Sequence, residues 1–157
     1  MYCLGWLLRE DNPDRAFKYM LQAAELGHKI SQVYVGMWFM CGIGVEKNIV
    51  SGKKWLIASL RKPKKYKATP DPLSCIIDDY IEFTDNEKLE ISTIISKNDP
   101  ECENIYSNIF LSLTTDDEEE SNNYLLDAYS ISADNDDEEA IKKIEHAMKI
   151  IESRSSE

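Results

Sequence analysis

The sequence predicts an all-α fold, a right-handed α-solenoid of stacked antiparallel helix hairpins that is followed by a C-terminal acidic helical segment. Three observations support this prediction. Apolar residues recur at three- and four-residue spacing along most of the chain. Capping residues, glycines and prolines separate these stretches from one another. A helix–turn–helix pattern is also repeated within residues 1–62, and internal repeats of this length are typical of solenoids.

Charge and composition restrict the class of partner. The chain has 157 residues, of which 43% are hydrophobic, and its formal net charge is −11. A surface that binds nucleic acid needs an excess of Lys and Arg, so we expect no nucleic-acid partner. Residues 1–70 carry twelve basic and five acidic residues (net +7), whereas residues 71–157 carry six and twenty-four (net −18). This division predicts two regions with different surfaces.

The four cysteines are widely spaced and form no Cys-x-x-Cys pair. Only His28 and His146 could add nitrogen ligands, so the pattern favours neither zinc nor any other cofactor. The chain has no basic leader and no apolar run of membrane-spanning length. We therefore expect a cytoplasmic protein with reduced thiols and no membrane contact. The cysteines are Cys3, Cys41, Cys75 and Cys102.

Two helices are expected at the N-terminus. Residues 1–9 form an apolar helix that ends before an acidic, proline-containing turn. Asn12 can cap the second helix and Pro13 suits its first position, because proline lacks the N–H that would be unsatisfied there. Gly27 stands where a left-handed residue is needed to end this helix.

The next helix, residues 30–41, is apolar almost all round, which indicates that other helices cover it on more than one side. Gly36 lies in its middle, and a glycine there predicts a close helix crossing. The glycines of the turn at 42–45 supply positive φ angles. Asn48 then caps a fourth helix that extends to about Leu60.

The internal repeat is visible as conserved spacing between its two copies. Three pairs of positions are 36 residues apart, whereas two equivalent dipeptides are only 31 residues apart. The first copy has therefore lost five residues, which we assign to its turn. The pairs are Ala16 and Gly52, Tyr19 and Trp55, and Ala23 and Ser59, and the dipeptides are Leu4–Gly5 and Val35–Gly36.

This pattern resembles the Sel-one-like repeat family, a helical relative of the tetratricopeptide repeats, over about residues 1–62. The chain departs from the family pattern at Val35, Asn48, Gly52 and Ser59, and the first copy lacks the Gly-x-Gly-Val turn. The resemblance implies a protein-interaction or scaffold function. It also implies structural roles for Gly5, Ala16, Ala23, Gly36, Phe39, Gly42, Gly44 and Trp55.

Beyond the repeats we expect a basic linker at residues 63–70 and an acidic helical region at residues 71–157. A seven-residue Ala–Ala interval in the last helix matches one in the first repeat, so this region is either a degenerate repeat or a chance likeness. The first copy begins inside a helix, which leaves open that the chain belongs to a longer solenoid or a larger assembly. The expected helices cover residues 71–83, 84–97, 99–113, 115–131 and 136–151.

Acidic runs at residues 116–120 and 134–139 allow three interpretations. Adjacent solvated acids have nothing to separate their pKa values, which disfavours catalysis. An EF-hand-type calcium loop would place Glu139 where a glycine is required. Acidic residues at helix N-termini are stabilised by the helix dipole, and this third interpretation is preferred. The ligands of the calcium alternative would be Asp134, Asp136, Glu138 and Glu145.

We therefore expect a non-enzymatic adaptor that binds a protein or peptide. An acidic decoy for a basic partner is one alternative. A β-lactamase-like enzyme is another, but the chain lacks the regularly paired cysteines of those relatives and any Gly-x-Ser-x-Gly motif. The variable positions of the first helix of each pair form stripes at i, i+4 and i+7, which either bind the partner or pack against the C-terminal helices. These positions are Tyr2, Trp6, Arg9, Val33, Met37 and Met40.

Overall fold

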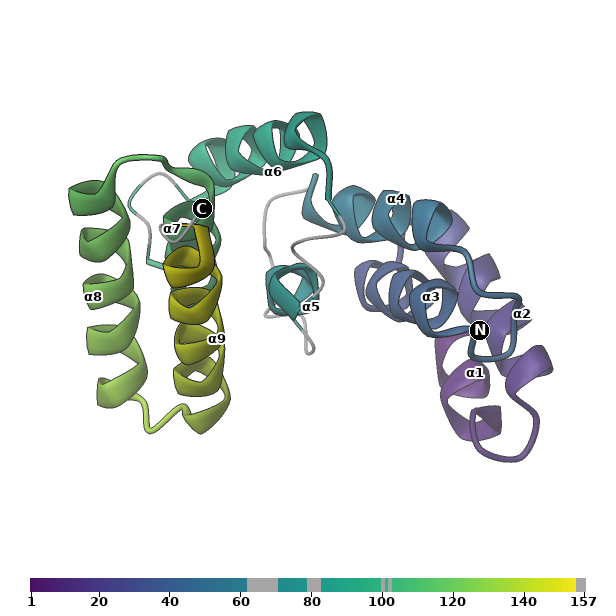
Figure 1. The fold of residues 1–157 in the computed structure, drawn as a ribbon. Coiled ribbons are helices and arrows are strands. Elements are labelled where there is room, and N and C mark those ends of the chain that lie inside the picture. The colour runs from purple at the N-terminus through teal and green to yellow at the C-terminus, as the bar shows by residue number, and fades with distance from the viewer. Residues whose placement is uncertain (62–70, 79–82, 100, 102, 155–157) are drawn as a thin grey trace. The chain divides into compact units, whose positions relative to one another are not determined.

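The computed structural model describes residues 1–61, 71–78, 83–99, 101 and 103–154. Every regular element within these residues is an α-helix, and none is a strand, so the all-α prediction is confirmed (Figure 1). The chain divides into two compact units, Met1–Ile76 and Ile77–Glu157. The predicted linker at residues 63–70 lies outside the described residues.

The first unit contains two helix hairpins in succession. Helix α1 (Tyr2–Leu8) packs against α2 (Pro13–Glu25), and α3 (Lys29–Cys41) packs against α4 (Ile49–Leu60). Helix α2 also packs against α3, which stacks one hairpin on the other, as Figure 1 shows. This arrangement of hairpins is the one expected of a helical solenoid.

The helix ends of this unit follow from the local sequence. The Asn12 side chain accepts a hydrogen bond from the Arg15 N–H at 3.1 Å, and Asn48 accepts one from the Ser51 N–H at 2.9 Å. Both predicted caps are confirmed. Gly27 (φ 85°) and Gly42 (φ 76°) adopt the left-handed conformation just after α2 and α3.

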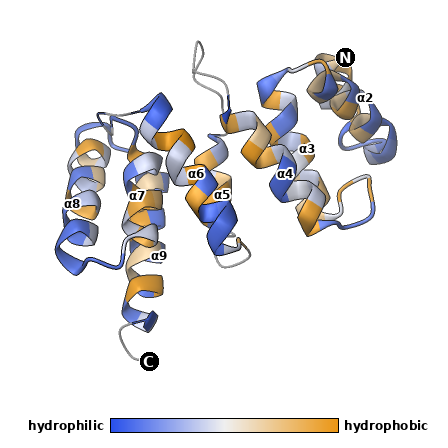
Figure 2. Ribbon diagram, turned by 90° about the horizontal axis from the view of Figure 1, so that it is seen from above, coloured by the Kyte–Doolittle hydropathy of each residue, from blue (hydrophilic) through white to orange (hydrophobic). Residues whose placement is uncertain are grey.

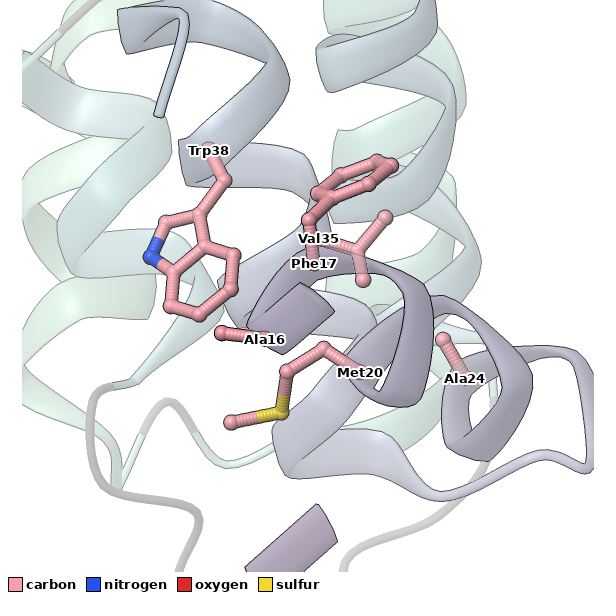
Figure 3. Packing of buried hydrophobic residues seen from close by; sticks show 6 residues of the cluster. All are labelled: Ala16, Phe17, Met20, Ala24, Val35 and Trp38. Carbon is pink, nitrogen blue, oxygen red and sulfur yellow. The ribbon is translucent and has the colours of Figure 1, made fainter. Parts of the chain in front are cut away.

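A hydrophobic cluster of the first unit lies at the interface between α2 and α3. Small and bulky side chains from α2 interlock with two residues of α3 (Figure 3). The rings of Phe17 and Trp38 lie 6.4 Å apart, centroid to centroid. The cluster comprises Ala16, Phe17, Met20, Ala24, Val35 and Trp38.

Helix α5 (Pro72–Asp78) spans the division between the units, and residues 79–82 of the predicted helix lie outside the described residues. The second unit continues with α6 (Asp85–Asn98), α7 (Ile105–Thr114), α8 (Glu118–Asp134) and α9 (Glu138–Arg154). Helices α7, α8 and α9 pack against one another, and α6 packs against α7. Hydrophilic and hydrophobic residues alternate along α8 and α9 (Figure 2), as expected for helices with one buried face.

Two predicted helix starts in the second unit are wrong. Helix α7 begins at Ile105 with Asn104 as its cap, because Asp99 instead accepts the N–H groups of Glu103 and Asn104 in the preceding loop. Helix α8 is capped by Asp117, whose carboxylate accepts the Glu120 N–H at 2.8 Å. The helix predicted at residues 84–97 corresponds to α6, and Thr84 and Glu87 form a capping box at its start.

Candidate functional site

The same glycine contact occurs in both hairpins and sets how closely their helices approach. A Cβ atom placed on Gly5 would lie 2.8 Å from Cγ of Met20. A Cβ atom on Gly36 would lie 2.8 Å from Cγ of Leu56 and 3.0 Å from the Gly52 carbonyl oxygen. Met20 and Leu56 are 36 residues apart, so the two crossings use equivalent positions of the repeat. Each hairpin thus holds its first helix at a defined, short distance from its second.

A third contact links the two hairpins through the glycine turn. Gly44 has a φ of 64°, and a Cβ atom on it would overlap the Pro13 carbonyl group at the start of α2. The turn of the second hairpin therefore lies against the beginning of the second helix of the first. This contact, together with the α2–α3 interface, determines where α1 and α3 lie relative to each other.

Four aromatic side chains line up across α1 and α3, and we call them the aromatic row. Within α1 the rings of Tyr2 and Trp6 are stacked with centroids 6.4 Å apart. Trp6 then meets Tyr34 of α3 at 5.1 Å. Tyr34 lies 6.3 Å from Trp38 in the next turn of the same helix. The row comprises Tyr2, Trp6, Tyr34 and Trp38, and all but Trp38 are partly exposed.

Arg9 places a cation at the edge of this row. Its guanidinium carbon lies 4.2 Å from the centroid of the Trp6 ring, within the range of a cation–π interaction. Its Nη1 donates to the Trp6 carbonyl oxygen at 3.1 Å, and its Nη2 donates to Glu10 Oε1 at 2.8 Å. The Arg9 side chain remains 38% exposed. An oriented but accessible guanidinium can donate hydrogen bonds to a carboxylate of a partner.

His28 lies at the other end of the row. Its ring centroid is 4.8 Å from that of Tyr2, and its Nδ1 accepts the Ser31 N–H at 3.2 Å, which caps α3. Desolvation of the ring, and to a smaller extent the positive N-terminal amine, lowers the pKa of His28. The neutral ring is the form that can accept this capping hydrogen bond.

Burial raises the pKa of Tyr34, and the neighbouring Tyr2 raises it further, whereas Arg9 acts in the opposite direction. The Tyr34 hydroxyl is therefore protonated at neutral pH. It can both donate and accept a hydrogen bond. The aromatic row thus combines ring faces, a neutral hydroxyl and one cation, which is a combination suited to protein recognition.

The structure brings together three of the six predicted partner-binding residues, Tyr2, Trp6 and Arg9. Met37 is partly buried and packs against the core, as Tyr2, Trp6 and Tyr34 of the aromatic row also do. The prediction is wrong for Val33 and Met40, which are 0% and 8% exposed. Helix α3 is covered by both α2 and α4, and Met40 reaches the position that a Cβ atom on Gly52 would occupy.

The residues with predicted structural roles lie in the first unit at contacts or turns. Four of them, Gly5, Ala16, Ala23 and Gly36, are buried. Phe39 and Trp55 are partly buried and pack against the core. Gly42 and Gly44 have positive φ angles in the turn between α3 and α4.

Tyr34 is a member of the row that the stripe pattern missed. A signal for it is present in the sequence, because Tyr-x-x-x-Trp occurs at residues 2–6 and again at residues 34–38. Residues four apart lie on the same face of a helix. Two such pairs in the first helices of consecutive hairpins therefore place four rings side by side when the hairpins stack.

The second unit contains an open cavity of about 670 Å³ between α6, α7 and α8 and the end of α9. Arg154 closes one side, and its Nη1 donates to the Leu113 carbonyl oxygen at 2.7 Å. The charged lining residues are of both signs, so the cavity indicates no single class of ligand. They are Asp85, Lys88, Asp116, Glu120 and Arg154.

Two Ser-x-x-Lys spacings occur, at residues 51–54 and 59–62, and Lys62 lies outside the described residues. Catalysis by such a pair requires the lysine amine beside the serine in a shielded site. Lys54 is exposed on the first turns of α4, and Ser59 donates its hydroxyl to the Leu56 carbonyl oxygen at 2.6 Å. Ser51, Lys54 and Ser59 are therefore explained as parts of helix α4.

Neither a metal site nor a membrane-spanning helix is found in the part of the chain that the structure describes. No group of three or more His, Cys, Asp and Glu side chains there could hold a metal ion. No helix there is long and apolar enough to cross a membrane. The acidic run at 134–139 contains the cap of α9, since Asp137 Oδ1 accepts the Ala140 N–H at 3.0 Å.

Comparison with known families finds one match. The family model described as Sel1 repeat matches residues 1–28 and 29–62. The boundary between these two matches falls between α2 and α3, so each match corresponds to one helix hairpin. Neither the curated proteins nor the solved structures provide a match.

Proposed function

We propose, from the premise that residues 1–62 are two Sel1 repeats, that the protein is a non-enzymatic interaction module that holds a protein or peptide partner on these repeats. Sel1 repeats are generally protein-interaction modules. The function therefore depends on a surface that both hairpins build together.

The aromatic row is the observation that carries this proposal. It runs from Tyr2 in the first repeat to Trp38 in the second through ring contacts of 5.1–6.4 Å. Tyr, Trp and Arg are the residue types that contribute most of the binding free energy in protein interfaces. The rings are already held by their neighbours, so little conformational entropy is lost when a partner binds.

The chemistry of the row points to an acidic peptide or helix with one large apolar side chain. Ring faces accommodate an apolar anchor, and Arg9 offers a guanidinium to a carboxylate. Residues 1–70 have a net charge of +7, which would also attract an acidic segment.

Selection of peptides from a random library on the intact protein would test the proposal. Selected peptides should carry an acidic residue near an aromatic or aliphatic one. Their affinity should fall at least about tenfold with Arg9→Gln, since one lost charge-assisted hydrogen bond is worth about 1.5–3 kcal/mol. Trp6→Leu should have a similar effect, since truncation of an aromatic anchor in an interface costs about 2 kcal/mol or more. Tyr129→Ala, at a 55% exposed aromatic residue in the second unit, is the matched control and should leave binding unchanged. Peptides that bind wild type and both row variants equally would exclude the row as the binding site.

An acidic decoy is less well supported by the distribution of charge. Acidic residues occupy the first turns of α6, α8 and α9, where the helix dipole stabilises them. The acidic residues of these first turns are therefore divided among three separate helix ends. This distribution suits a solvated surface better than a mimic of a polyanion.

A cytoplasmic location is also part of the proposal. Cys3, Cys41 and Cys75 are free thiols, and the first two are exposed. Exposed thiols persist in a reducing compartment. Fractionation of the cells that express the protein, with thiol labelling of each fraction, would test the location.

A further inference from the structure

The exposed face of α8 carries an apolar stripe, which we call the α8 stripe. It consists of Leu126, Tyr129 and Ala133, at spacings of three and four residues. Residues at these spacings lie on the same face of a helix. All three are exposed, Leu126 to 65% and Tyr129 to 55%. Two large apolar side chains are therefore presented side by side to solvent.

The other face of α8 packs into the second unit. Its buried residues are Ser121, Leu125, Ala128 and Ser132, and both α7 and α9 contact the helix. These buried positions account for the packing of α8. The α8 stripe contributes little to it, because its two large side chains remain more than half exposed.

The charges of α8 all have one sign. The helix contains five acidic residues and neither Lys nor Arg. Glu118, Glu119 and Glu120 lie in the first turn, where the helix dipole stabilises them. Asp127 lies in the middle of the helix, and Asp134 is its last residue, where the dipole opposes a negative charge. The dipole therefore accounts for three of the acids and leaves Asp127 and Asp134 unexplained.

Acidic residues lie toward both ends of the α8 stripe. Glu119 precedes Leu126 by seven residues, and Asp134 follows it by eight. With a rise of about 1.5 Å per residue, each lies about 10–12 Å along the helix from Leu126. Both acids are exposed, and exposed Asp127 is next to Leu126 in the chain. A partner that lies along α8 therefore meets an apolar centre with negative charge on either side.

We propose that the α8 stripe is a docking surface for a basic amphipathic helix of another protein. The apolar face of that helix covers Leu126 and Tyr129, and burial of these side chains drives binding. Its Lys and Arg residues lie two turns to either side and meet the acids of α8. Charge complementarity selects this occupant, because an acidic helix would meet like charges at both ends. The aromatic row is proposed to bind an acidic peptide, so the two partner classes differ in charge.

Calorimetric titration of the full chain with a designed peptide tests this proposal. The probe is an acetylated and amidated helical peptide that has two leucines one turn apart at its centre and lysines two turns to either side. Its affinity should fall at least about tenfold when the ionic strength rises from about 0.05 M to about 0.5 M, because salt screens exposed charges. A peptide with glutamates in place of the lysines, and a lysine peptide without the leucines, should each bind at least about tenfold more weakly.

Variants of the chain locate the binding site. Leu126→Asn should lower the affinity at least about tenfold, and Asp134→Asn about threefold, since one exposed ion pair contributes little. The matched controls should leave the affinity unchanged. They are Leu89→Asn, at a leucine 67% exposed on α6, and Glu145→Gln, at an exposed acid on α9. Trp6→Leu in the aromatic row should also have no effect, so this test is independent of the proposed function.

The melting temperature of each variant should match that of wild type, because substitutions at exposed positions change stability little. Equal affinity of the leucine peptide for wild type and Leu126→Asn would overturn the proposal, as would equal binding of the lysine peptide without leucines. Failure of wild type to bind the probe would overturn it too. A dimer of the wild-type chain in light scattering that Leu126→Asn abolishes would show a second copy as the occupant, which would also overturn the proposal.

Discussion

At the residue scale, Gly36 lies where the crossing of α3 and α4 leaves no room for a side chain. A Cβ atom there would lie 2.8 Å from Leu56 Cγ and 3.0 Å from the Gly52 carbonyl oxygen. Gly36→Ala gains up to about 1 kcal/mol of helix propensity, but overpacking costs about 1–3 kcal/mol. We therefore expect Gly36→Ala to lower the free energy of unfolding modestly and Gly36→Leu to unfold the first unit, as measured by urea denaturation.

The Leu56 side chain provides the control for this prediction. Leu56→Ala removes the nearer of the two contacts, so the double variant with Gly36→Ala should be more stable than the sum of the single effects predicts. Strict additivity of the two changes would contradict a steric cause.

His28 makes the stability of α3 depend on pH. Its pKa is lowered from the ordinary value of 6.5 in the folded protein, so the unfolded chain binds the proton more tightly. The contribution of the neutral ring is fully present above pH 6.5 and is lost as pH falls through the window below it. Protonation would also remove the acceptor for the Ser31 N–H and place a cation at the N-terminus of α3.

Comparison with His28→Asn isolates this effect, because asparagine can cap the helix but does not titrate. The difference in unfolding free energy between wild type and this variant should be constant above pH 6.5. At lower pH wild type should lose stability relative to the variant. A difference that is independent of pH from 5 to 8 would argue that the capping ring does not titrate in this range.

At the scale of the element, α3 differs from α1 in that the second helices of both hairpins, α2 and α4, pack against it. Helix α2 covers Val35 and Trp38, and α4 covers Gly36 and Met40. Its counterpart in the first hairpin, α1, packs against α2 and meets α3 through the Trp6 and Tyr34 rings, and its Leu7 side chain is exposed. Equivalent positions of a repeat can thus have different exposure, because their environment depends on the neighbouring hairpin.

At the scale of the whole molecule, the two units allow unfolding to be followed separately. All three tryptophans, Trp6, Trp38 and Trp55, belong to the first unit. Their fluorescence therefore reports on that unit, whereas far-ultraviolet circular dichroism reports on the helices of both. Each core contains a buried phenylalanine, Phe17 in α2 and Phe110 in α7.

We expect Phe17→Ala to cost about 3–5 kcal/mol and to lower the midpoint of the fluorescence transition. Phe110→Ala should lower the midpoint of the part of the dichroism transition that comes from the second unit. It should leave the fluorescence midpoint unchanged. Lys18→Ala, at an exposed residue beside Phe17, should change neither signal. A single transition that both variants shift equally would show that the units unfold together.

The sequence by itself determined the helical class, the repeat and the asparagine caps of α2 and α4, whereas the His28 cap of α3 was not predicted. Asn12 and Asn48 act through hydrogen bonds to residues three positions away, so their role is readable locally. Pairs such as Tyr2 and Trp6 share a helix face for the same reason. The starts of α7 and α8 were misplaced because several neighbouring Asp, Asn and Thr residues can each cap a helix, and the loop decides among them.

Only the tertiary structure decided which of these faces are covered. Periodicity tells which residues share a face, but α3 is apolar all round, so its pattern could not distinguish Val33, which is buried, from Tyr34, which is partly exposed. That difference arises from the position of the neighbouring helices, and contacts between residues far apart in the chain set this position. The two Tyr-x-x-x-Trp pairs become one aromatic row because the stacking of α2 on α3 brings the first helices of both hairpins together.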